Sequence, residues 1–523
     1  MNTANKILIL LFLLSLLKES QAQEWWENAY DYKALDINRI SIPVNNVGGI
    51  DYRYSWSYWD YNSVKRTMVF DQGLWIIGKI NEQIHLAHKQ WSGSYSPGPI
   101  INNNAAMNVF PEDSLKYRVY KIELNDTSVP GYDYSEWPAH LGAPVSEYGN
   151  PVIYNNQTLW TVYNGLDSSL SIRNWWNNLP VFPIEVHSLA YGYPGGPVDW
   201  LKDVVFFEWQ IINKGTETID STYFGFWTDI DINMWTNNYP AVDSSIQLGY
   251  CWTPDDSGYF IPMSVGYVWK YGPAVDSPGD TAIYRGTIKT DYKNLDLTSF
   301  HGIADDAEVG PITSPARSTL DAWNMARGFD ADGNVIIDPT NGFPTKFPFN
   351  GDPVTNTGFI FPSAGGSGAG FVMFSGPVNL APQDTQWVMA ALIVSSGTDY
   401  RDAIVNLRLK AETIQVLPYD ELVTKYSVKP SLVNPPLKFS LSQNFPNPFN
   451  NGTKILFELP YKSHVTISIY DILGGKVSII ANNEFPGGQN EVTFFGNQFA
   501  SGIYFYEIKA GSFIQTKKMV LIK

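Results

Sequence analysis

Short runs of alternating aromatic and β-branched residues, separated by Gly, Pro and Asn, constrain the fold of this chain most strongly. The stretch Asp51–Tyr58 alternates strictly and places Tyr52, Tyr54, Trp56 and Tyr58 on one face of a strand. Sheets favour such runs, and Gly or Pro ends them. We therefore predict an all-β fold with this aromatic face in the core. The alternative is a surface that stacks on sugar rings.

Further strands follow along the chain. Gly73–Ile80 and Ile84–Trp91 predict a hairpin around Asn81-Glu82-Gln83. The polar stretch Asn213–Glu217 predicts a turn between two later strands. Other predicted strands are Tyr117–Leu124, Leu159–Tyr163, Ile184–Tyr193, Val204–Ile212, Thr222–Ile230, Ser264–Trp269, Gly370–Phe374 and Trp387–Ser395.

Two helices are predicted by their capping residues and apolar spacing. Ser318–Arg327 begins at a hydroxyl side chain and stops before Gly328. Asp399–Leu417 begins at a capping carboxylate, and four of its apolar residues fall on one face at helical spacing. These four are Ile404, Leu407, Ala411 and Ile414. We expect this second helix to pack against the edge of a sandwich.

The first residues predict a secretory signal peptide over residues 1–22. Lys6 supplies a positive charge, Ile7–Leu17 is almost wholly apolar, and Ser20-Gln21-Ala22 favours cleavage before Gln23. A membrane-spanning helix needs about 20 apolar residues, and no later stretch has that length. We therefore expect export, and no transmembrane segment after signal cleavage.

Charge and motif content exclude several functions. The chain has 35 Lys and Arg against 51 Asp and Glu, a net charge of −16, so we predict no nucleic-acid partner. The single cysteine, Cys251, excludes an internal disulfide and lies between aromatic residues that predict an unreactive thiol. The sequence contains no Gly-x-Ser-x-Gly, His-Glu-x-x-His or phosphate-loop motif. No catalytic residue is therefore predicted.

The C-terminal 85 or so residues carry a recognisable order of motifs. Gln443–Asn450 reads QNFPNPFN, Val465–Gly474 reads VTISIYDILG, Gly502–Tyr506 reads GIYFY, and Lys517–Lys523 reads KKMVLIK. This order resembles the type A C-terminal sorting domain of the type IX secretion system of Bacteroidota-like bacteria. One departure is Asn450-Asn451-Gly452, where that family more often continues with Pro.

The resemblance implies a small immunoglobulin-like sandwich of about seven strands. Turn residues place six of them at Lys454–Leu459, Val465–Tyr470, Lys476–Ile480, Glu491–Phe495, Gly502–Lys509 and Phe513–Ile522. It also implies recognition by the type IX secretion machinery, with removal of the domain on arrival in the Thr424–Ser442 region. The sorting-signal residues that it implies are Pro446, Asn447, Pro448, Gly502, Tyr504, Lys517 and Lys518.

Four segments are therefore expected: the signal peptide, a β-rich body over residues 23–423, a linker over 424–438 and a sorting domain over 439–523. Pro430, Pro435 and Pro436 favour an extended linker. The body is expected as one large sandwich or as two packed sandwiches divided near residues 235–260. The body contains, in this order, Gly73–Gly78 (GLWIIG), Trp227–Asp231 (WTDID) and Leu380–Thr385 (LAPQDT). With these motifs it resembles, between Val69 and Tyr419, a group of exported proteins of Bacteroidota- and Ignavibacteria-like bacteria, and that resemblance carries no activity.

Acidic residues near a strand end suit a cation. Asp229 and Asp231 point to one face, and Asp243 follows after a short loop. Carboxylate oxygens are the ligands that Ca²⁺ prefers, so these three residues are a candidate calcium site. The alternative is that they are solvated or cap the Asn237-Asn238 loop. A second acidic loop, Asp330–Asn334, has the Asp-Gly of a hairpin turn and the wrong spacing for an EF-hand.

Two further pairs are candidates for binding. Trp175 and Trp176, flanked by Asn in a predicted loop, are candidates for glycan contact, with packing in the core as the alternative. Glu185 and His187 lie on one face of a predicted strand and could form an acid–base pair or two metal ligands. The alternative is a buried histidine held by a structural hydrogen bond.

The leading expectation is a non-enzymatic surface or secreted protein that serves adhesion, glycan binding or envelope structure. Its expected partners are the secretion machinery and a surface polysaccharide or extracellular glycan. The alternative is a secreted hydrolase acting on polysaccharide or protein. Two carboxylates roughly 5–10 Å apart in an exposed cleft favour that alternative.

Overall fold

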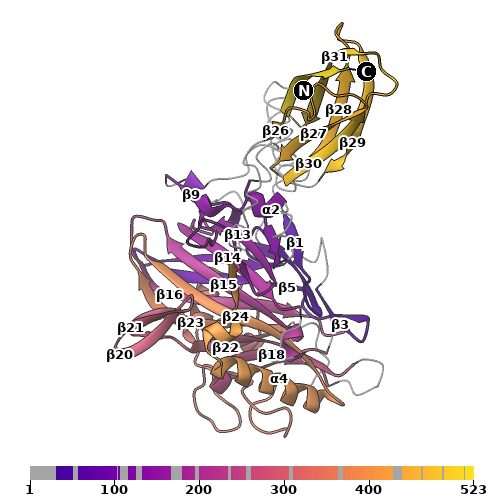
Figure 1. Ribbon diagram of the computed structural model, residues 1–523. Helices are drawn as coiled ribbons and strands as arrows, with labels where there is room; N and C mark the ends of the chain where they lie inside the picture. The colour runs from indigo at the N-terminus through magenta and orange to yellow at the C-terminus, as the bar shows by residue number, and fades with distance from the viewer. Residues whose placement is uncertain are drawn as a thin grey trace, which may run out of the picture. The chain divides into compact units, whose positions relative to one another are not determined.

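Strands dominate the protein, which confirms the all-β prediction (Figure 1). The chain divides into two compact units, residues 1–120 with 154–425 and residues 121–153 with 426–523. The predicted signal peptide lies outside the described residues. The computed structural model describes residues 31–50, 57–102, 104–105, 116–124, 132–166, 179–194, 199–233, 237–254, 261–304, 310–362, 369–427, 439–460, 463–485, 488–511 and 513–522.

The first unit contains a large antiparallel sheet. Its strands follow the order β13-β14-β15-β24-β19-β18-β17, and β8 pairs with β13. The strands are β8 (Ser96–Pro97), β13 (Gln157–Asn164), β14 (Ile184–Gly192), β15 (Val204–Asn213), β17 (Tyr239–Asp243), β18 (Leu248–Trp252), β19 (Met263–Tyr271) and β24 (Thr385–Ser396). The central strand β24 is buried on both faces, as its continuous apolar run predicts.

A second sheet of the first unit has the order β22-β23-β16-β5-β6-β7. Its strands are β5 (Asp71–Ile80), β6 (Gln83–Gln90), β7 (Ser92–Gly93), β16 (Ile219–Ile230), β22 (Leu297–Ala304) and β23 (Ala369–Leu380). The predicted hairpin is β5–β6, and its two turn residues, Asn81 and Glu82, have positive φ. This is the geometry that matches the twist of paired strands.

The two sheets pack face to face through aromatic rings. Phe226 of β16 lies 5.5 Å from Trp209 of β15 and 4.5 Å from Tyr267 of β19, measured between ring centroids. The predicted turn after β15 therefore crosses from one sheet to the other, because β15 and β16 belong to different sheets. Both sheets also contain strands from before and after residues 235–260. The structure thus differs from the alternative of two sandwiches divided there.

Two helices cover the outer faces of the sandwich. Helix α3 (Thr319–Arg327) is capped by Ser318 and ends at the left-handed Gly328, as predicted. Helix α4 (Tyr400–Val416) is capped by Asp399, and the four predicted apolar residues are buried. It packs on β19 and β24, which lie inside the large sheet, so the expected position at a sandwich edge is wrong. The reason is that these central strands are apolar on their outer side as well.

Shorter elements of both units complete the described chain up to residue 427. The stretch Asp51–Tyr58 falls mostly outside the described residues, and its last residue begins β3. The predicted turn at Asp330–Asn334 closes between Phe329 and Val335, which are bridged. The remaining elements are β1 (Tyr32–Leu35), β2 (Ile40–Asn45), β3 (Tyr58–Tyr61), β4 (Val64–Thr67), β9 (Ile100–Ile101), β10 (Asn104–Ala105), β11 (Tyr120–Glu123), α2 (Tyr132–Ser135), η2 (Ala139–Leu141), β12 (Val152–Tyr154), η4 (Asp199–Asp203), η5 (Ser244–Ile246), β20 (Ala274–Tyr284), β21 (Thr287–Asn294), η6 (Gly310–Ile312), α5 (Tyr419–Leu422) and β25 (Lys425–Ser427).

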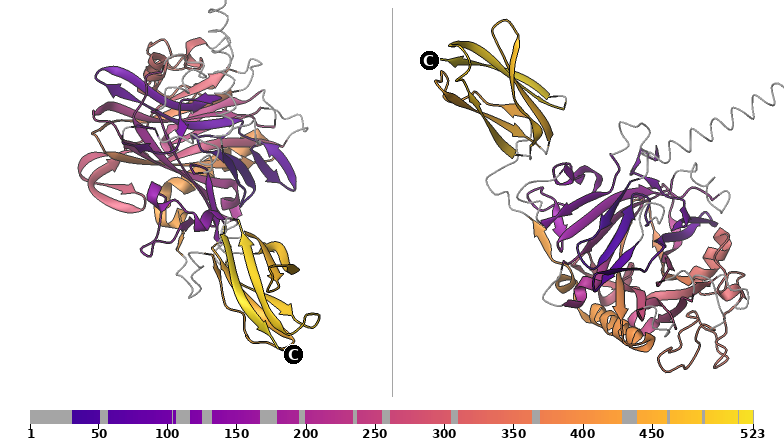
Figure 2. Two further views of the ribbon diagram at one scale, coloured as in Figure 1. Left: turned by 90° about the horizontal axis from the view of Figure 1, so that it is seen from above. Right: turned by 90° about the vertical axis from the view of Figure 1, so that its right-hand side faces the viewer.

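Residues 439–522 form a small sandwich in the second unit (Figure 2). One sheet has the order β26-β27-β30 and the other β29-β28-β31-β32. All six strands placed by the sequence are present, and β26 is a seventh. The strands are β26 (Ser440–Leu441), β27 (Gly452–Leu459), β28 (Ser463–Tyr470), β29 (Lys476–Phe485), β30 (Gly488–Phe495), β31 (Gly502–Ala510) and β32 (Phe513–Leu521).

The strand registers define two ends of this sandwich. The chain enters β26 beside the last residues of β27, where Ser440 pairs with Glu458. At the opposite end, Gly452 pairs with Phe495 and Gly502 pairs with Leu521. We call this opposite end, formed by the β26–β27, β28–β29 and β30–β31 connections and the residues after β32, the distal end.

Two fully buried histidines predict that acid destabilises the first unit. Burial lowers the pKa of His301 to about 4 and that of His88 to about 3, from an ordinary 6.5. The unfolded chain takes up protons below pH 6.5 while these folded imidazoles stay neutral, so stability is present above pH 6.5 and lost as the pH falls towards 4. Each histidine is expected to contribute about 1.4 kcal/mol per pH unit to the loss.

His301→Gln should therefore reduce the fall in the free energy of unfolding between pH 6.5 and 5, measured by urea denaturation. Replacing the exposed His464 with Gln is the matched control and should leave the dependence unchanged. An identical pH dependence in His301→Gln and the unaltered protein would contradict the prediction.

Candidate functional site

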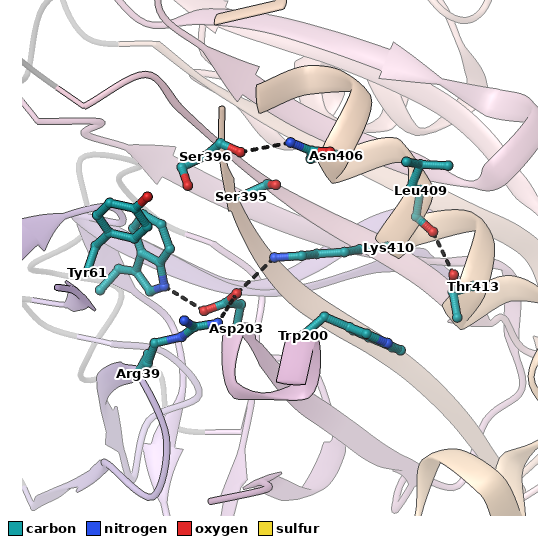
Figure 3. Close-up of a pocket in the computed structure, with 11 residues that line it drawn as sticks. Arg39, Tyr61, Trp200, Asp203, Ser395, Ser396, Asn406, Leu409, Lys410 and Thr413 are labelled. Carbon is teal, nitrogen blue, oxygen red and sulfur yellow. Dashed lines mark hydrogen bonds and ion pairs between the residues drawn. The ribbon is translucent and has the colours of Figure 1, made fainter. Parts of the chain in front are cut away.

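A cavity of about 400 Å³ opens in the first unit beside helix α4 (Figure 3). It lies between α4, the end of β24, the short helix η4 and strand β3. The lining residues are Arg39, Trp59, Tyr61, Trp200, Asp203, Ser395, Ser396, Asn406, Leu409, Lys410 and Thr413. Aromatic, basic and hydroxyl side chains therefore meet in one hollow.

Asp203 is the centre of the polar wall of this cavity. Trp59 Nε1 donates to its Oδ1 at 2.7 Å. Arg39 Nη2 and Lys410 Nζ donate to its Oδ2 at 2.7 and 2.9 Å (Figure 3). Because the carboxylate is only 5% exposed and both oxygens are occupied, it holds the two cations in place.

Helix α4 supplies the opposite wall. Asn406, Leu409, Lys410 and Thr413 are spaced by three and four residues, so they share one face of the helix. Asn406 Nδ2 donates to the carbonyl oxygen of Ser396 at 3.0 Å and joins the helix to the end of β24. The wall is therefore built on two regular elements rather than on a loop.

The charged side chains around the cavity differ in how far they are exposed to solvent. Burial lowers the pKa of Lys410, and the Asp203 carboxylate offsets part of that effect. Arg39 is 33% exposed and also lies 3.7 Å from Asp199, a residue 71% exposed. Asp199 in turn binds Lys202 at 2.7 Å. The buried Asp203 carboxylate thus lies on the inner side of Arg39 and Lys410, and the exposed Asp199 lies on the solvent side of Arg39.

Three aromatic side chains line the same cavity. The ring centroids of Trp59 and Tyr61 are 4.8 Å apart, with an interplanar angle of 34°. Trp59 is 1% exposed, whereas Tyr61 and Trp200 are half-buried. Trp59 therefore supports the wall, and Tyr61 and Trp200 are the two rings available to a ligand (Figure 3).

Two of the three candidate calcium ligands have other roles in the structure. Asp229 Oδ2 accepts a hydrogen bond from Trp91 Nε1 at 2.7 Å, and Asp243 caps η5. Burial raises the pKa of Asp231 to about 6. No group of three or more His, Cys, Asp or Glu side chains among the described residues is placed to hold a metal ion. The calcium site remains a prediction.

Glu185 and His187 do form the pair that their spacing suggests. His187 Nε2 lies 2.9 Å from Glu185 Oε1, and the other carboxylate oxygen accepts from the Ile100 amide at 2.6 Å. Lys214 Nζ lies 3.7 Å from the same carboxylate. These contacts favour a structural role. Burial also raises the pKa of the Cys251 thiol, in agreement with the predicted low reactivity.

No pattern in the sequence marks the residues of the cavity. Trp175 and Trp176, the predicted glycan contacts, lie outside the described residues. Trp59, Arg39 and Lys410 lie 144, 164 and 207 residues from Asp203 along the chain. None of them belongs to a local motif, so only the folded chain brings them together.

The structure gathers most of the predicted sorting-signal residues at the distal end. Pro446, Asn447 and Pro448 lie in the β26–β27 connection, Gly502 begins β31, and Tyr504, Lys517 and Lys518 follow on β31 and β32. Asn447 Oδ1 accepts a hydrogen bond from the Val520 amide at 2.8 Å. Tyr504 donates to the Ala500 carbonyl at 2.9 Å. These bonds hold the connections of the distal end in place.

The distal end also exposes apolar side chains. Leu473 is 91% exposed, Phe445 78% and Ile472 67%. Asp471 Oδ1 accepts hydrogen bonds from the amides of Leu473 and Gly475 at 2.9 and 2.8 Å, which fixes the β28–β29 turn. Large apolar residues held out into water at a fixed turn are typical of a surface that contacts a partner.

Comparison with known proteins identifies this C-terminal part. Residues 443–523 match the family of the secretion system C-terminal sorting domain. A search of curated proteins finds no match. Among the described residues, no helix is both long and apolar enough to cross a membrane.

Two solved structures are similar in part. A polysaccharide lyase matches over 93% of this chain and 46% of its own, with 7% identity and a TM-score of 0.28. PorZ, an essential surface component of the type IX secretion system of Porphyromonas gingivalis, matches over 95% and 58%, with 10% identity and a TM-score of 0.13. This chain therefore spans about half the length of these proteins, and neither likeness assigns a fold or an activity to it. The C-terminal domain is a type IX secretion sorting domain, and the protein is secreted to the cell surface or the extracellular space.

Proposed function

We propose that the first unit is a non-enzymatic binding module of the cell surface, and that its α4 cavity binds glycan. The observation that carries the proposal is the combination of two available aromatic rings with fixed polar groups in one hollow. Ligand sites of small molecules are typically concave and apolar with a few convergent polar groups.

The chemistry of the walls suits a sugar. Tyr61 and Trp200 supply ring faces for the apolar side of a pyranose. Ser395, Ser396 and Asn406 supply hydroxyl and amide groups for its hydroxyls. A cavity of about 400 Å³ is within the range of ligand sites, which begins at about 300 Å³.

The alternative, a secreted hydrolase, receives less support from the same residues. Asp203 is the only carboxylate among the described residues that line the cavity, and its two oxygens are already bonded to Trp59, Arg39 and Lys410. Glycoside hydrolysis generally uses two carboxylates about 5–10 Å apart. An acid that holds two cations is poorly suited to exchange protons with a substrate.

Trp200→Ala is expected to weaken glycan binding by about tenfold or more. Loss of a stacked aromatic ring and of the area that it buries costs on the order of 1–3 kcal/mol of binding free energy. A glycan array with the unaltered full chain would first supply the ligand, and titration calorimetry would then give the affinities. A hydrolase panel run beside the array tests the alternative.

Phe343→Ala is the matched control, since Phe343 is 69% exposed and does not line the cavity. If Trp200→Ala and Phe343→Ala bind glycan with equal affinity, the α4 cavity is not the glycan site. Turnover of an array ligand that is abolished by Asp203→Asn would replace the binding function with the hydrolase.

We also propose that the sorting signal is read at the distal end of the sandwich. The sorting-signal residues form this surface or hold its connections in place. They are Pro446, Asn447, Pro448, Gly502, Tyr504, Lys517 and Lys518. The fixed β28–β29 turn with Ile472 and Leu473 favours an apolar contact with the secretion machinery.

A further inference from the structure

The charge of the α4 cavity differs from that of the chain as a whole. The chain carries a net charge of −16, yet two of the cavity residues are cations and one is an anion. Asp203 neutralises one of the two cations, so its cluster with Arg39 and Lys410 retains one positive charge. Partial burial of a cation costs free energy unless an anion or hydrogen-bond acceptors compensate its charge.

The surplus charge faces the open side of the cluster. Asp203 is 5% exposed, whereas Lys410 is 15% and Arg39 33% exposed. Lys410 Nζ uses two of its three N–H groups, one on Asp203 at 2.9 Å and one on the Val394 carbonyl at 2.6 Å. The third N–H has no partner among the described residues and remains for a ligand.

We propose that the α4 cavity is selective for acidic saccharides, whose carboxylate or sulfate group is bound by Lys410 and Arg39 while the sugar ring contacts Trp200 and Tyr61. This inference rests on the proposed glycan binding and specifies its ligand. Hydrogen bonds between ionised partners are roughly twice as strong as neutral ones. Both cations are already held by Asp203, so little side-chain ordering is needed on binding.

Asp199 does not close the site to an anion. It is 71% exposed, bonded to Lys202 at 2.7 Å and further from Arg39, at 3.7 Å. An exposed ion pair of this kind contributes little and is readily exchanged for a ligand group. A neutral sugar makes the same ring contacts but leaves the surplus charge unmatched, which is the physical basis of the selectivity.

The test compares three oligosaccharides of equal length and linkage, one neutral, one with uronate residues and one with sulfate esters, by calorimetry on the full chain. At least one acidic ligand is expected to bind ten times more tightly than the neutral one, with an advantage that falls as salt rises from 50 to 500 mM. Comparison of the affinities for the uronate and the sulfate oligosaccharide identifies the acidic group that the cavity binds.

Lys410→Met should reduce the ratio of acidic to neutral affinity at least fivefold, whereas Lys293→Met, which removes an exposed cation outside the cavity, should keep it. If Lys410→Met does not fold, the salt dependence of the unaltered protein decides the question. Equal affinity for neutral and acidic ligands overturns this inference and leaves glycan binding intact. Failure of all three ligands together with an empty glycan array overturns the proposed function itself.

Discussion

Replacing Lys89 with Met is expected to lower the free energy of unfolding of the first unit by about 3–5 kcal/mol. Lys89 Nζ lies 2.7 Å from Asp71 Oδ2, and the two side chains are 2% and 1% exposed. Met keeps the aliphatic part of the side chain, which packs closely against Gly73. The contact is so close that a Cβ atom added to Gly73 would lie 2.3 Å from Lys89 Cβ. The substitution therefore removes the charge more than the volume and leaves a carboxylate buried without its ammonium partner.

Urea denaturation at pH 7 measures this loss. The matched control is Glu82→Gln, which breaks a surface ion pair of 3.3 Å with Lys79, where Glu82 is 90% exposed. Such pairs are worth about 0–1 kcal/mol. The double variant Asp71→Asn with Lys89→Met should recover part of the stability, because it leaves no unpaired charge. Equal losses in Lys89→Met and Glu82→Gln would show that the buried pair contributes no more than a surface one.

Replacing Ile472 and Leu473 together with Asp is expected to stop secretion while the sorting domain stays folded. The two side chains are 67% and 91% exposed, so charges there disturb no core. The turn that carries them is fixed by Asp471, which both substitutions spare. Charges placed on an apolar contact surface must be desolvated when the partner binds, and each costs several kcal/mol.

Cell fractionation and blotting measure where the double variant accumulates. Deletion of Phe439–Lys523 provides the reference for complete retention in the periplasm. Ile514→Asp is the matched control, because Ile514 is 57% exposed and pairs with Lys509 near the entry end of the same sandwich. Normal secretion of the Ile472/Leu473 variant would show that the distal end is not the recognised surface. Normal secretion after the deletion would contradict the sorting role.

Local sequence was sufficient for elements whose geometry depends on neighbouring residues. Asp399 as a cap and the spacing of Ile404, Leu407, Ala411 and Ile414 identified α4 almost to the residue. Its place on the sheet was predicted wrongly, because the sequence of a helix does not state which strands lie beneath it. Hairpin β5–β6 was predicted for a similar reason, since its strands and turn are contiguous.

The sorting domain was predicted in most detail, because its motifs lie within one short segment and turn residues separate its strands. The body was harder. Strands β15 and β16 follow each other in the chain but belong to different sheets, and β24 reaches β15 from far along the chain. Alternation of residues gives the faces of a strand and leaves its partners open.

The sequence by itself determined the class of fold, the capped helices, the strands of the sorting domain and the route of export. These depend on residues close together in the chain, where periodicity and turn chemistry act directly. Only the tertiary structure decided the α4 cavity and the buried Asp71–Lys89 pair. Asp203 meets Arg39 and Lys410 across 164 and 207 residues. A contact at that separation is set by the packing of sheets and helices, and no local pattern records it.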